Sequence, residues 1–257
     1  MTPAELQRLL VRMLYDPVLV ERIYRGDPVV GLDMGSRALI TRVDARAWGT
    51  DPYRRARTLH ALLEEFPASA AEVGVAGLDR FFGERAFHDA IATRGSLAVA
   101  FGQWLAARAG PVAEIERAVV AIRRAADMPP PSLPTGHLVC APTARALTLP
   151  EGTCARWEGL RAALGPDPLP TLLGGFRAPP RGPGARRPAM ELLLVERVDG
   201  GEAVGIASEG LHALLTRASR PRAHHKLRQV AVRLGATATE ADEVLDDLMT
   251  QGLLIRG

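Results

Sequence analysis

The side chains that could perform acid–base or metal chemistry are scattered along this sequence. No histidine has a second histidine or a carboxylate at a spacing typical of a metal site; they stand at His60, His88, His137, His212, His224 and His225. His224 and His225 are adjacent on a predicted helix, so their rings point in different directions. The neighbouring carboxylates Glu64–Glu65 and Asp246–Asp247 diverge for the same reason, which disfavours paired acid–base catalysis.

The two cysteines do not form a metal motif either. Cys140 and Cys154 are not a C-x-x-C pair, and we interpret both as structural thiols, with a disulfide between them as the alternative. The sequence also lacks a phosphate-binding loop, a G-x-G-x-x-G after a predicted strand, H-E-x-x-H and G-x-S-x-G. We therefore expect no catalytic residue, no metal ligand and no cofactor in this chain.

Charge and hydropathy limit the kinds of partner and the cellular location that we expect for this protein. The 257 residues carry a formal net charge of +3, and Lys226 is the only lysine. Arginine at all other basic positions suits carboxylate or phosphate partners, or simply a solvated surface. No uncharged apolar run reaches the length of about 18 residues that indicates a transmembrane helix. The segment from Glu5 onward is charged and unlike a signal peptide, so we expect a cytoplasmic protein without a membrane segment.

Helical periodicity runs through the first half of the chain. Asp16 before Pro17 is a predicted N-cap. One predicted helix places Leu59, Leu62, Leu63 and Phe66 on a single stripe and is stopped by Pro67, and others are expected at 33–47, 78–92 and 112–127. The proline-rich segment 129–136 cannot continue a helix. We predict an all-α helical domain over 1–128, a proline-rich linker over 129–136 and an α+β domain over 137–257.

Two aromatic residues flank a predicted corner of the helical domain. Trp48 and Tyr53 lie on either side of residues 49–52, which read as a break between helices. Most other aromatic residues fall at helical spacing and are expected to pack in the core. Trp48 and Tyr53 are therefore the candidates for a partner-binding surface.

The α+β domain changes to strand-like patterns. Strands at 137–141 and 146–149 are expected to pair with each other, and 190–198 with 203–206 across a glycine turn. Three helices follow; Ser208 is the predicted cap of the first, and the last opens at a predicted capping box of Thr237 and Glu240. An apolar strand at 253–255 ends the sequence. This order of elements suits a winged helix, and a small peptide-capturing module shares much of it.

Charge separates those two interpretations. The third helix of the module, 239–250, has carboxylates and no basic residue: Glu240, Asp242, Glu243, Asp246 and Asp247. In a winged helix this segment would enter the DNA groove, where phosphates repel carboxylates. The acidic helix therefore disfavours nucleic acid as the partner.

Several stretches resemble one protein family. They are LQRLLVRMLYDPVLVERIYRGDP, GLDMGSRALITRVD, LEEFPASAAEVG and LDRFFGERAFHDAI, with Leu6-Gln7, Tyr24-Arg25-Gly26-Asp27 and Phe66-Pro67 before Gly74 as the elements most like the family. Over about residues 4–108 the chain resembles the helical domain of partner proteins encoded beside multinuclear non-heme iron oxidative enzymes. That group includes the partner subunits of methanobactin and thiaglutamate biosynthesis.

The resemblance implies a non-catalytic role. Such partners do not hold the iron, which belongs to the oxidase; they bind that enzyme as a heterodimer and present a ribosomally synthesised precursor peptide to it. The terminal module is similar to a peptide recognition element, in which the peptide adds a strand to a sheet edge and packs on the third helix. An acidic third helix would then meet a basic peptide or simply face water. The implied peptide site is the strand edge at Leu192, Leu194 and Val195 with the groove beside Val244 and Leu248.

The sequence is also compatible with two other functions. Arginines before and on the second helix of the module, with the element order, are compatible with a winged-helix DNA-binding regulator; they are Arg217, Arg220, Arg222, Arg228 and Arg233. An enzyme of an unrecognised type is the third hypothesis.

Overall fold

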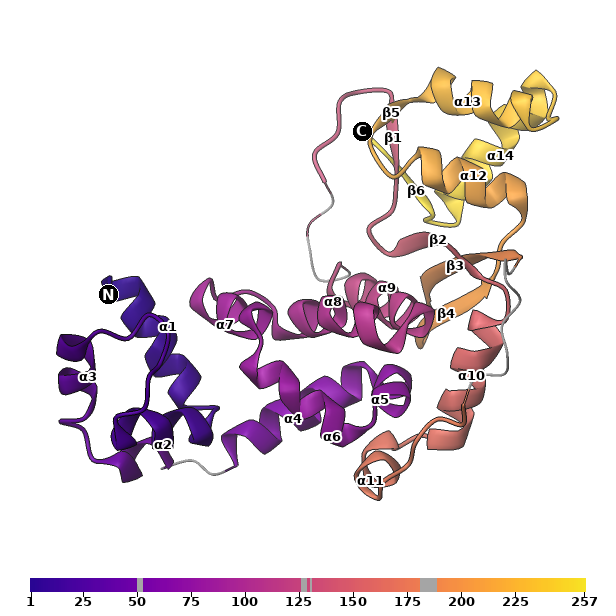
Figure 1. The fold of residues 1–257 in the computed structure, drawn as a ribbon. Helices are drawn as coiled ribbons and strands as arrows, with labels where there is room; N and C mark the ends of the chain where they lie inside the picture. The colour runs from indigo at the N-terminus through magenta and orange to yellow at the C-terminus, as the bar shows by residue number, and fades with distance from the viewer. Residues whose placement is uncertain (50–52, 126–128, 130, 181–188) are drawn as a thin grey trace. The chain divides into compact units, whose positions relative to one another are not determined.

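The computed structural model describes residues 1–49, 53–125, 129, 131–180 and 189–257. Helices and two small antiparallel sheets make up the chain (Figure 1), which confirms the α+β class. The contacts divide the chain into two compact units, Met1–Ala109 with Ala163–Ala178, and Gly110–Ala162 with Pro179–Gly257. Residue 130 of the predicted linker lies outside the described residues, and so do the corner residues 50–52.

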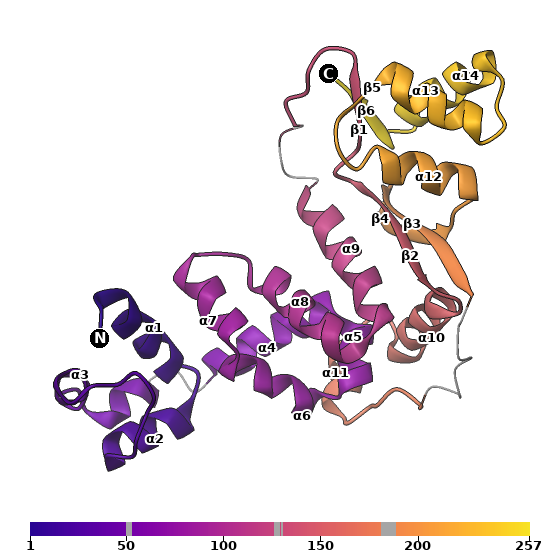
Figure 2. The ribbon, with the colours of Figure 1, turned by 45° about the horizontal axis from the view of Figure 1, so that its top comes forward.

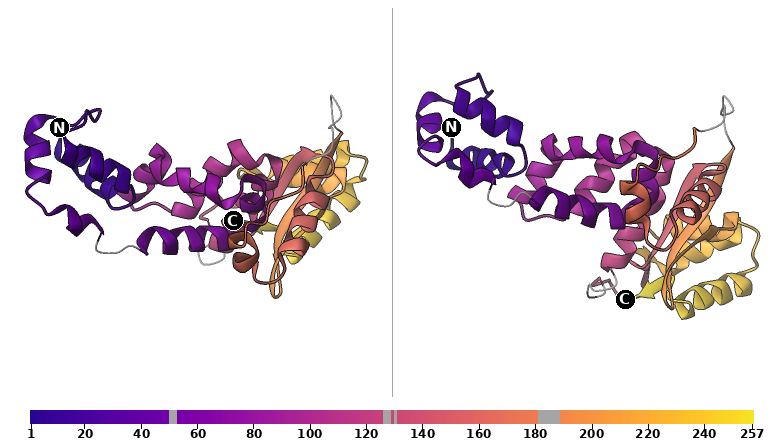
Figure 3. Two further views of the ribbon diagram at one scale, coloured as in Figure 1. Left: turned by 60° about the horizontal axis from the view of Figure 1, so that its bottom comes forward. Right: turned by 90° about the horizontal axis from the view of Figure 1, so that it is seen from below.

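The first unit is helical. Its elements are α1 (Pro3–Met13), α2 (Pro17–Arg25), α3 (Met34–Ile40), η1 (Ala45–Gly49), α4 (Arg54–Glu65), α5 (Pro67–Val73), α6 (Val75–Leu78), η2 (Asp79–Gly83), α7 (Arg85–Ala92), α8 (Leu97–Ala109) and α11 (Pro168–Leu173). The polar cap predicted at Asp16 is present, because its carboxylate accepts the Leu19 backbone N–H at 3.0 Å. Figure 3 shows α1, α2 and α3 grouped together at the N-terminal end of this unit.

Three helix boundaries differ from the sequence-based expectation. The helix expected over 33–47 ends at Ile40 and resumes as the 3-10 helix η1. Pro67 was expected only to stop a helix, yet it also occupies the first position of α5, where its missing N–H costs nothing. The helix expected over 78–92 is divided into α6, η2 and α7.

An aromatic cluster forms the core of the first unit. Phe81 is fully buried, and its ring centroid lies 4.9 Å from Phe101, 5.5 Å from Phe87 and 5.6 Å from Trp104. Most of these rings meet edge to face, an arrangement in which the positive ring edge approaches the negative face. The expectation that most aromatic residues pack in the core is therefore confirmed.

The second unit contains both sheets. Its elements are α9 (Pro111–Ala125), β1 (His137–Cys140), β2 (Ala144–Pro150), α10 (Thr153–Leu164), β3 (Met190–Val198), β4 (Gly201–Ile206), α12 (Glu209–Arg217), β5 (Arg222–Ala223), α13 (His224–Arg233), α14 (Ala238–Thr250) and β6 (Leu254–Arg256). The strand order is β5-β1-β6 in one sheet and β2-β3-β4 in the other. The predicted hairpin of β3 and β4 is confirmed, with Gly200 and Gly201 at positive φ in its turn.

The predicted pairing of the first two strands is wrong. β1 pairs with β5 and β6, whereas β2 pairs along its whole length with β3. The short connection holds a turn, in which the Ala144 N–H donates to the Ala141 carbonyl at 3.0 Å. The chain thus passes from one sheet to the other instead of folding back, and both strands pair with segments that come later in the sequence.

Helices cover both faces of the β2-β3-β4 sheet (Figure 2). α9 packs on one face, where Val119 and Ile122 share a buried cluster with Val195. α12 packs on the other face, where Leu214 and Leu194 belong to the core of the terminal module. The structure therefore differs from the expected boundary at 128, because α9 belongs to the sheet-containing unit, and α11 packs with α4 and α5 in the first unit.

The terminal helices close around one apolar core. Leu214 of α12, Leu227 of α13 and Leu245 of α14 are all buried in it, together with Leu254 of β6. The predicted capping box at the start of α14 is confirmed: the Thr237 hydroxyl accepts the Glu240 N–H at 3.3 Å, and the Glu240 carboxylate accepts the Thr237 N–H at 2.7 Å.

The capping box gives a direct prediction. Replacing Thr237 with alanine removes the hydroxyl acceptor at the first turn of α14, and we expect a loss of about 1 kcal/mol in the free energy of unfolding. Thr239 is exposed on the same turn, so Thr239→Ala is the matched control and should change stability by less than about 0.5 kcal/mol. Urea unfolding followed by circular dichroism measures both; equal effects would contradict a role for the cap.

Candidate functional site

The strand predicted to bind peptide does not have a free edge. Leu192, Leu194 and Val195 lie in β3, the central strand of its sheet, which pairs with β2 on one side and β4 on the other. The side chains of Leu194 and Val195 are buried between the sheet and its covering helices. The predicted docking edge at these residues is therefore wrong, because their backbone groups are already used within the sheet.

An edge of the same sheet is nevertheless open in the described part of the chain. β4 is a terminal strand there, and the bond from the Ala207 N–H to the Leu192 carbonyl at 2.8 Å fixes which backbone groups face β3. By the alternation of antiparallel pairing, the backbone groups of Glu202, Val204 and Ile206 point away from β3. β6 pairs with β1 in the other sheet, so it leaves this edge uncovered.

The groove predicted beside Val244 and Leu248 is present. It has a cavity volume of about 390 Å³ and lies between α12, α13 and α14. Leu214 and Leu248 are buried in its floor, whereas Leu234 and Val244 are 49% and 39% exposed at its rim. The volume falls within the range of about 300–1,000 Å³ that is typical of ligand pockets.

Local sequence signals position the groove. Gly235 adopts a φ of +106° directly after α13, which turns the chain toward α14 and leaves Leu234 at the end of the helix. Ser208 caps α12 by accepting the Leu211 N–H at 3.3 Å, and both residues line the groove. β4 ends at Ile206, and Ser208, two residues later, lines the groove. The end of the open edge therefore lies next to the groove.

The groove has an acidic border. Asp247 lines it, and the exposed Glu243 and Asp246 lie on the same helix. One carboxylate of α14, that of Asp242, already pairs with Arg228 at 2.9 Å. Hydrogen bonds from the Thr237 backbone hold the pKa of Glu240 below its ordinary value, so this group stays charged. An apolar groove that the Asp247 carboxylate lines, on a helix with further exposed carboxylates, suits a ligand that combines apolar anchors with basic side chains.

The two residues predicted to contact a partner have different surroundings. Tyr53 is 69% exposed beside the start of α4. Trp48 is half-buried, and its indole N–H donates to the Tyr24 hydroxyl at 2.9 Å. Trp48 therefore has a packing role as well as an accessible surface, and Tyr53 does not line the same pocket.

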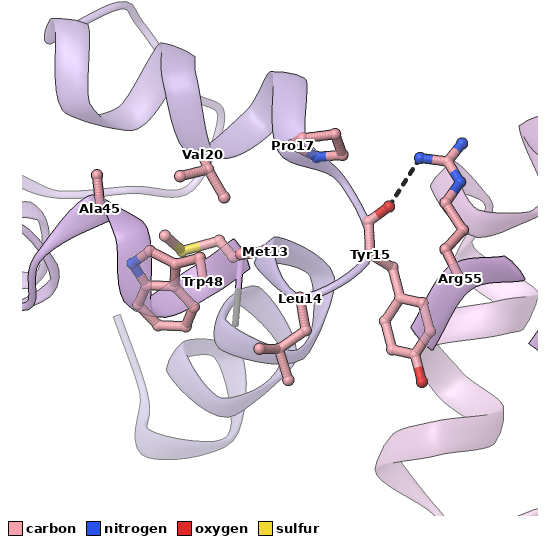
Figure 4. A pocket seen from close by; sticks show the side chains of 9 residues that line it. Met13, Leu14, Tyr15, Pro17, Val20, Ala45, Trp48 and Arg55 are labelled. Atoms are coloured by element: carbon pink, nitrogen blue, oxygen red, sulfur yellow. Dashed lines mark hydrogen bonds between the residues drawn. The ribbon is translucent and has the colours of Figure 1, made fainter. Parts of the chain in front are cut away.

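Trp48 forms one wall of a small apolar pocket in the first unit. The cavity volume is about 270 Å³. Figure 4 shows Met13, Val20 and Ala45 close to the Trp48 ring, with Arg55 on the opposite side, where its guanidinium donates to the Tyr15 carbonyl at 2.9 Å. Arg55 also bonds Asp79 at 2.7 Å, so it is a structural bridge that closes this side of the pocket.

The cysteines are separate thiols, as expected. Cys140 and Cys154 are both free, and burial raises the pKa of the Cys140 thiol to about 11. A thiol with so high a pKa carries little reactive thiolate near neutral pH. Across the residues that the structure describes, no group of three or more His, Cys, Asp or Glu side chains is placed to hold a metal ion. None of the described helices is long and apolar enough to cross a membrane.

Sequence reasoning missed most of the groove. Leu211, Leu234 and Ala236 line it, but each reads in the sequence as an ordinary core or helix-end residue. The signal that could have found it was the apolar Leu234 immediately before Gly235, since a leucine at a helix end often packs against the next helix. The edge of β4 could be identified only once β2 was known to occupy the other side of β3.

No family model matches the chain, and none of the curated proteins matches it.

Proposed function

We propose that this chain is a non-catalytic partner subunit that recruits a ribosomally synthesised precursor peptide to a multinuclear non-heme iron oxidase. The observation that carries the proposal is the apolar, acid-bordered groove of α12, α13 and α14 next to the open edge of β4. Together with the resemblance of the helical domain to such partner proteins, this groove supports a peptide as the ligand. The iron and the chemistry belong to the oxidase.

Two features of the groove favour an extended peptide. The edge of β4 offers backbone donors and acceptors at Glu202, Val204 and Ile206, so a peptide can add a strand there. From Ile206 the chain leads to Ser208 on the groove wall, and the next apolar side chain of such a peptide would enter between Leu234 and Val244. Backbone pairing supplies affinity in this mode, and the groove supplies selectivity.

The negative charge of α14 favours a peptide with basic residues. Glu243, Asp246 and Asp247 are exposed, and no described ion pair involves them. A precursor with lysine or arginine next to an apolar anchor gains Coulomb attraction here, and one with acidic residues at the same places is repelled. We therefore propose a basic–apolar recognition sequence in the precursor.

The first unit is the proposed contact for the oxidase. Tyr53 is exposed, and Trp48 presents an apolar pocket that one large side chain of a partner can fill. Aromatic residues in such pockets often carry much of the binding free energy of an interface. The resulting assembly is a heterodimer of the chain and the enzyme.

Co-purification tests this function. The tagged full chain is expressed with a neighbouring iron oxidase and its short precursor, and the complex is separated by size exclusion. We expect one peak that contains both proteins and retains the labelled peptide. If the chain elutes alone and the peptide stays with the oxidase or free, the proposal is overturned.

A DNA-binding regulator is the second candidate function. The observation that favours it is a set of exposed cations around β5 and the start of α13: Arg217, Arg220, Arg222 and Lys226. The carboxylates of α14 oppose it, because phosphate would approach them in a groove-reading orientation. A mobility shift with duplex DNA at low salt that weakens steeply with added salt would support it, and no shift would remove it.

A further inference from the structure

A second pocket, distinct from that of Trp48, lies in the first unit between α1, the loop before α3, and α7. Its cavity volume is about 380 Å³. Arg8 and Arg12 reach it from α1, and His88 from α7, while Leu9 and Leu32 give it an apolar part. Stacking of Tyr15 on Phe82, with ring centroids 5.7 Å apart, holds α1 against this region. The pocket is therefore built by packed elements.

Buried donors in this pocket have no partner. Both ring nitrogens of His88 and the Nε of Arg12 are shielded from solvent, and within the described residues none of the three atoms meets the distance and angle of a hydrogen bond, although the Phe82 backbone still acts on the His88 ring. A buried polar group that stays unsatisfied destabilises the protein, and more so when it is charged. Asp16 forms an ion pair with Arg12, but its carboxylate lies 3.6 Å from Arg12 Nε, which is too far for a hydrogen bond. A ligand with acceptor oxygens would satisfy the Arg12 Nε–H and the single N–H of a neutral His88 ring.

The carboxylates of the pocket are already engaged. Glu5 accepts the Thr2 N–H at 2.7 Å, and Asp89 pairs with Arg85 at 3.1 Å. The guanidinium groups of Arg8 and Arg12 provide positive charge at the pocket, and Asp16 offsets part of the charge of Arg12. Burial and the charge of Arg12 lower the pKa of His88, so its ring stays neutral and can donate one N–H near neutral pH. The pocket favours a single negative charge.

We propose that this pocket binds a carboxylate carried on an apolar body. One oxygen would accept from the Arg12 guanidinium and the other from the His88 N–H, because hydrogen bonds to an ionised carboxylate are stronger than those between neutral groups. Arg8 would add charge at the mouth of the pocket, and Leu9 and Leu32 would contact the apolar body. The same chemistry occurs in a small free carboxylate and in an acidic side chain of a partner protein.

Nuclear magnetic resonance of the histidine rings tests this site on the full chain. Sodium benzoate is the probe for a free carboxylate, and N-acetylglutamate amide is the probe for an acidic side chain. The His88 ring signals, assigned with His88→Gln, should move and saturate with at least one probe, while those of His225 should not move. Saturation at lower benzoate concentrations assigns the site to small carboxylates, and the reverse order assigns it to a partner's side chain.

Variants make the result specific to the pocket. Arg12→Gln should weaken the response of His88 at least tenfold, and Arg8→Gln, which changes an exposed residue, should weaken it by a smaller factor with the fold unchanged. Arg42→Gln is the matched control, because Arg42 is exposed in the same unit and does not line the pocket. If neither probe moves His88, or if Arg12→Gln and Arg8→Gln both respond like the control, the carboxylate site is overturned.

Discussion

Replacing Val244 with arginine is expected to weaken binding of the precursor peptide at least tenfold while the fold is retained. Val244 is 39% exposed at the rim of the groove, so the longer side chain can be accommodated without disturbing the core. The new guanidinium fills the groove and repels the basic side chains that the carboxylates of α14 attract. A tenfold change corresponds to about 1.4 kcal/mol, well within the range for a central interface residue.

A neighbouring valine provides the control. Val232 on α13 is 43% exposed and does not line the groove, so Val232→Arg adds the same charge and bulk to the same module. We expect this variant to bind the peptide with the affinity of the wild type. Fluorescence anisotropy of a labelled precursor measures both affinities, and equal losses in the two variants would show that the groove is not the binding site.

Replacing Phe81 with alanine is expected to destabilise the first unit by about 3–5 kcal/mol. Phe81 is 0% exposed, and it lies at the centre of the ring cluster with Phe87, Phe101 and Trp104. Truncation removes the ring, its edge-to-face contacts and the packing of α7 against α8. Since whole domains are stable by only about 5–15 kcal/mol, this loss would leave the unit close to unfolded.

The control for this core change is Leu39→Ala. Leu39 is 56% exposed on α3, so its truncation should alter the free energy of unfolding by less than about 0.5 kcal/mol. Urea unfolding followed by circular dichroism compares the two variants. A loss below about 1 kcal/mol for Phe81→Ala would contradict the view that the ring cluster holds the unit together.

Local signals were predictable from the sequence, and non-local pairing was not. The caps at Asp16, Ser208 and Thr237 depend on residues three positions away, and all three are present. β1 pairs with β5 and β6, which follow it by more than 80 positions in the sequence, as the register Leu138 to Arg222 shows. Hydrophobic alternation indicates that a strand exists without identifying which strand lies beside it.

The candidate site was predicted only in part for the same reason. Val244 and Leu248 were placed correctly in a groove, because helical periodicity fixes which side of α14 faces the core. Leu192, Leu194 and Val195 were placed wrongly on an edge, since the position of β2 beside β3 follows from a contact across about 45 residues of chain. The pocket of Arg12 and His88 joins α1 to α7 and has no motif in the sequence.

Reconstitution of peptide modification tests the central claim most directly. The neighbouring iron oxidase is incubated with its precursor at low peptide concentration, alone, with the chain, and with Val244→Arg or Val232→Arg. We expect modified peptide with the wild-type chain and with Val232→Arg, and little without the chain or with Val244→Arg. If the oxidase modifies the precursor equally well in the absence of the chain, recruitment of the peptide is not its function.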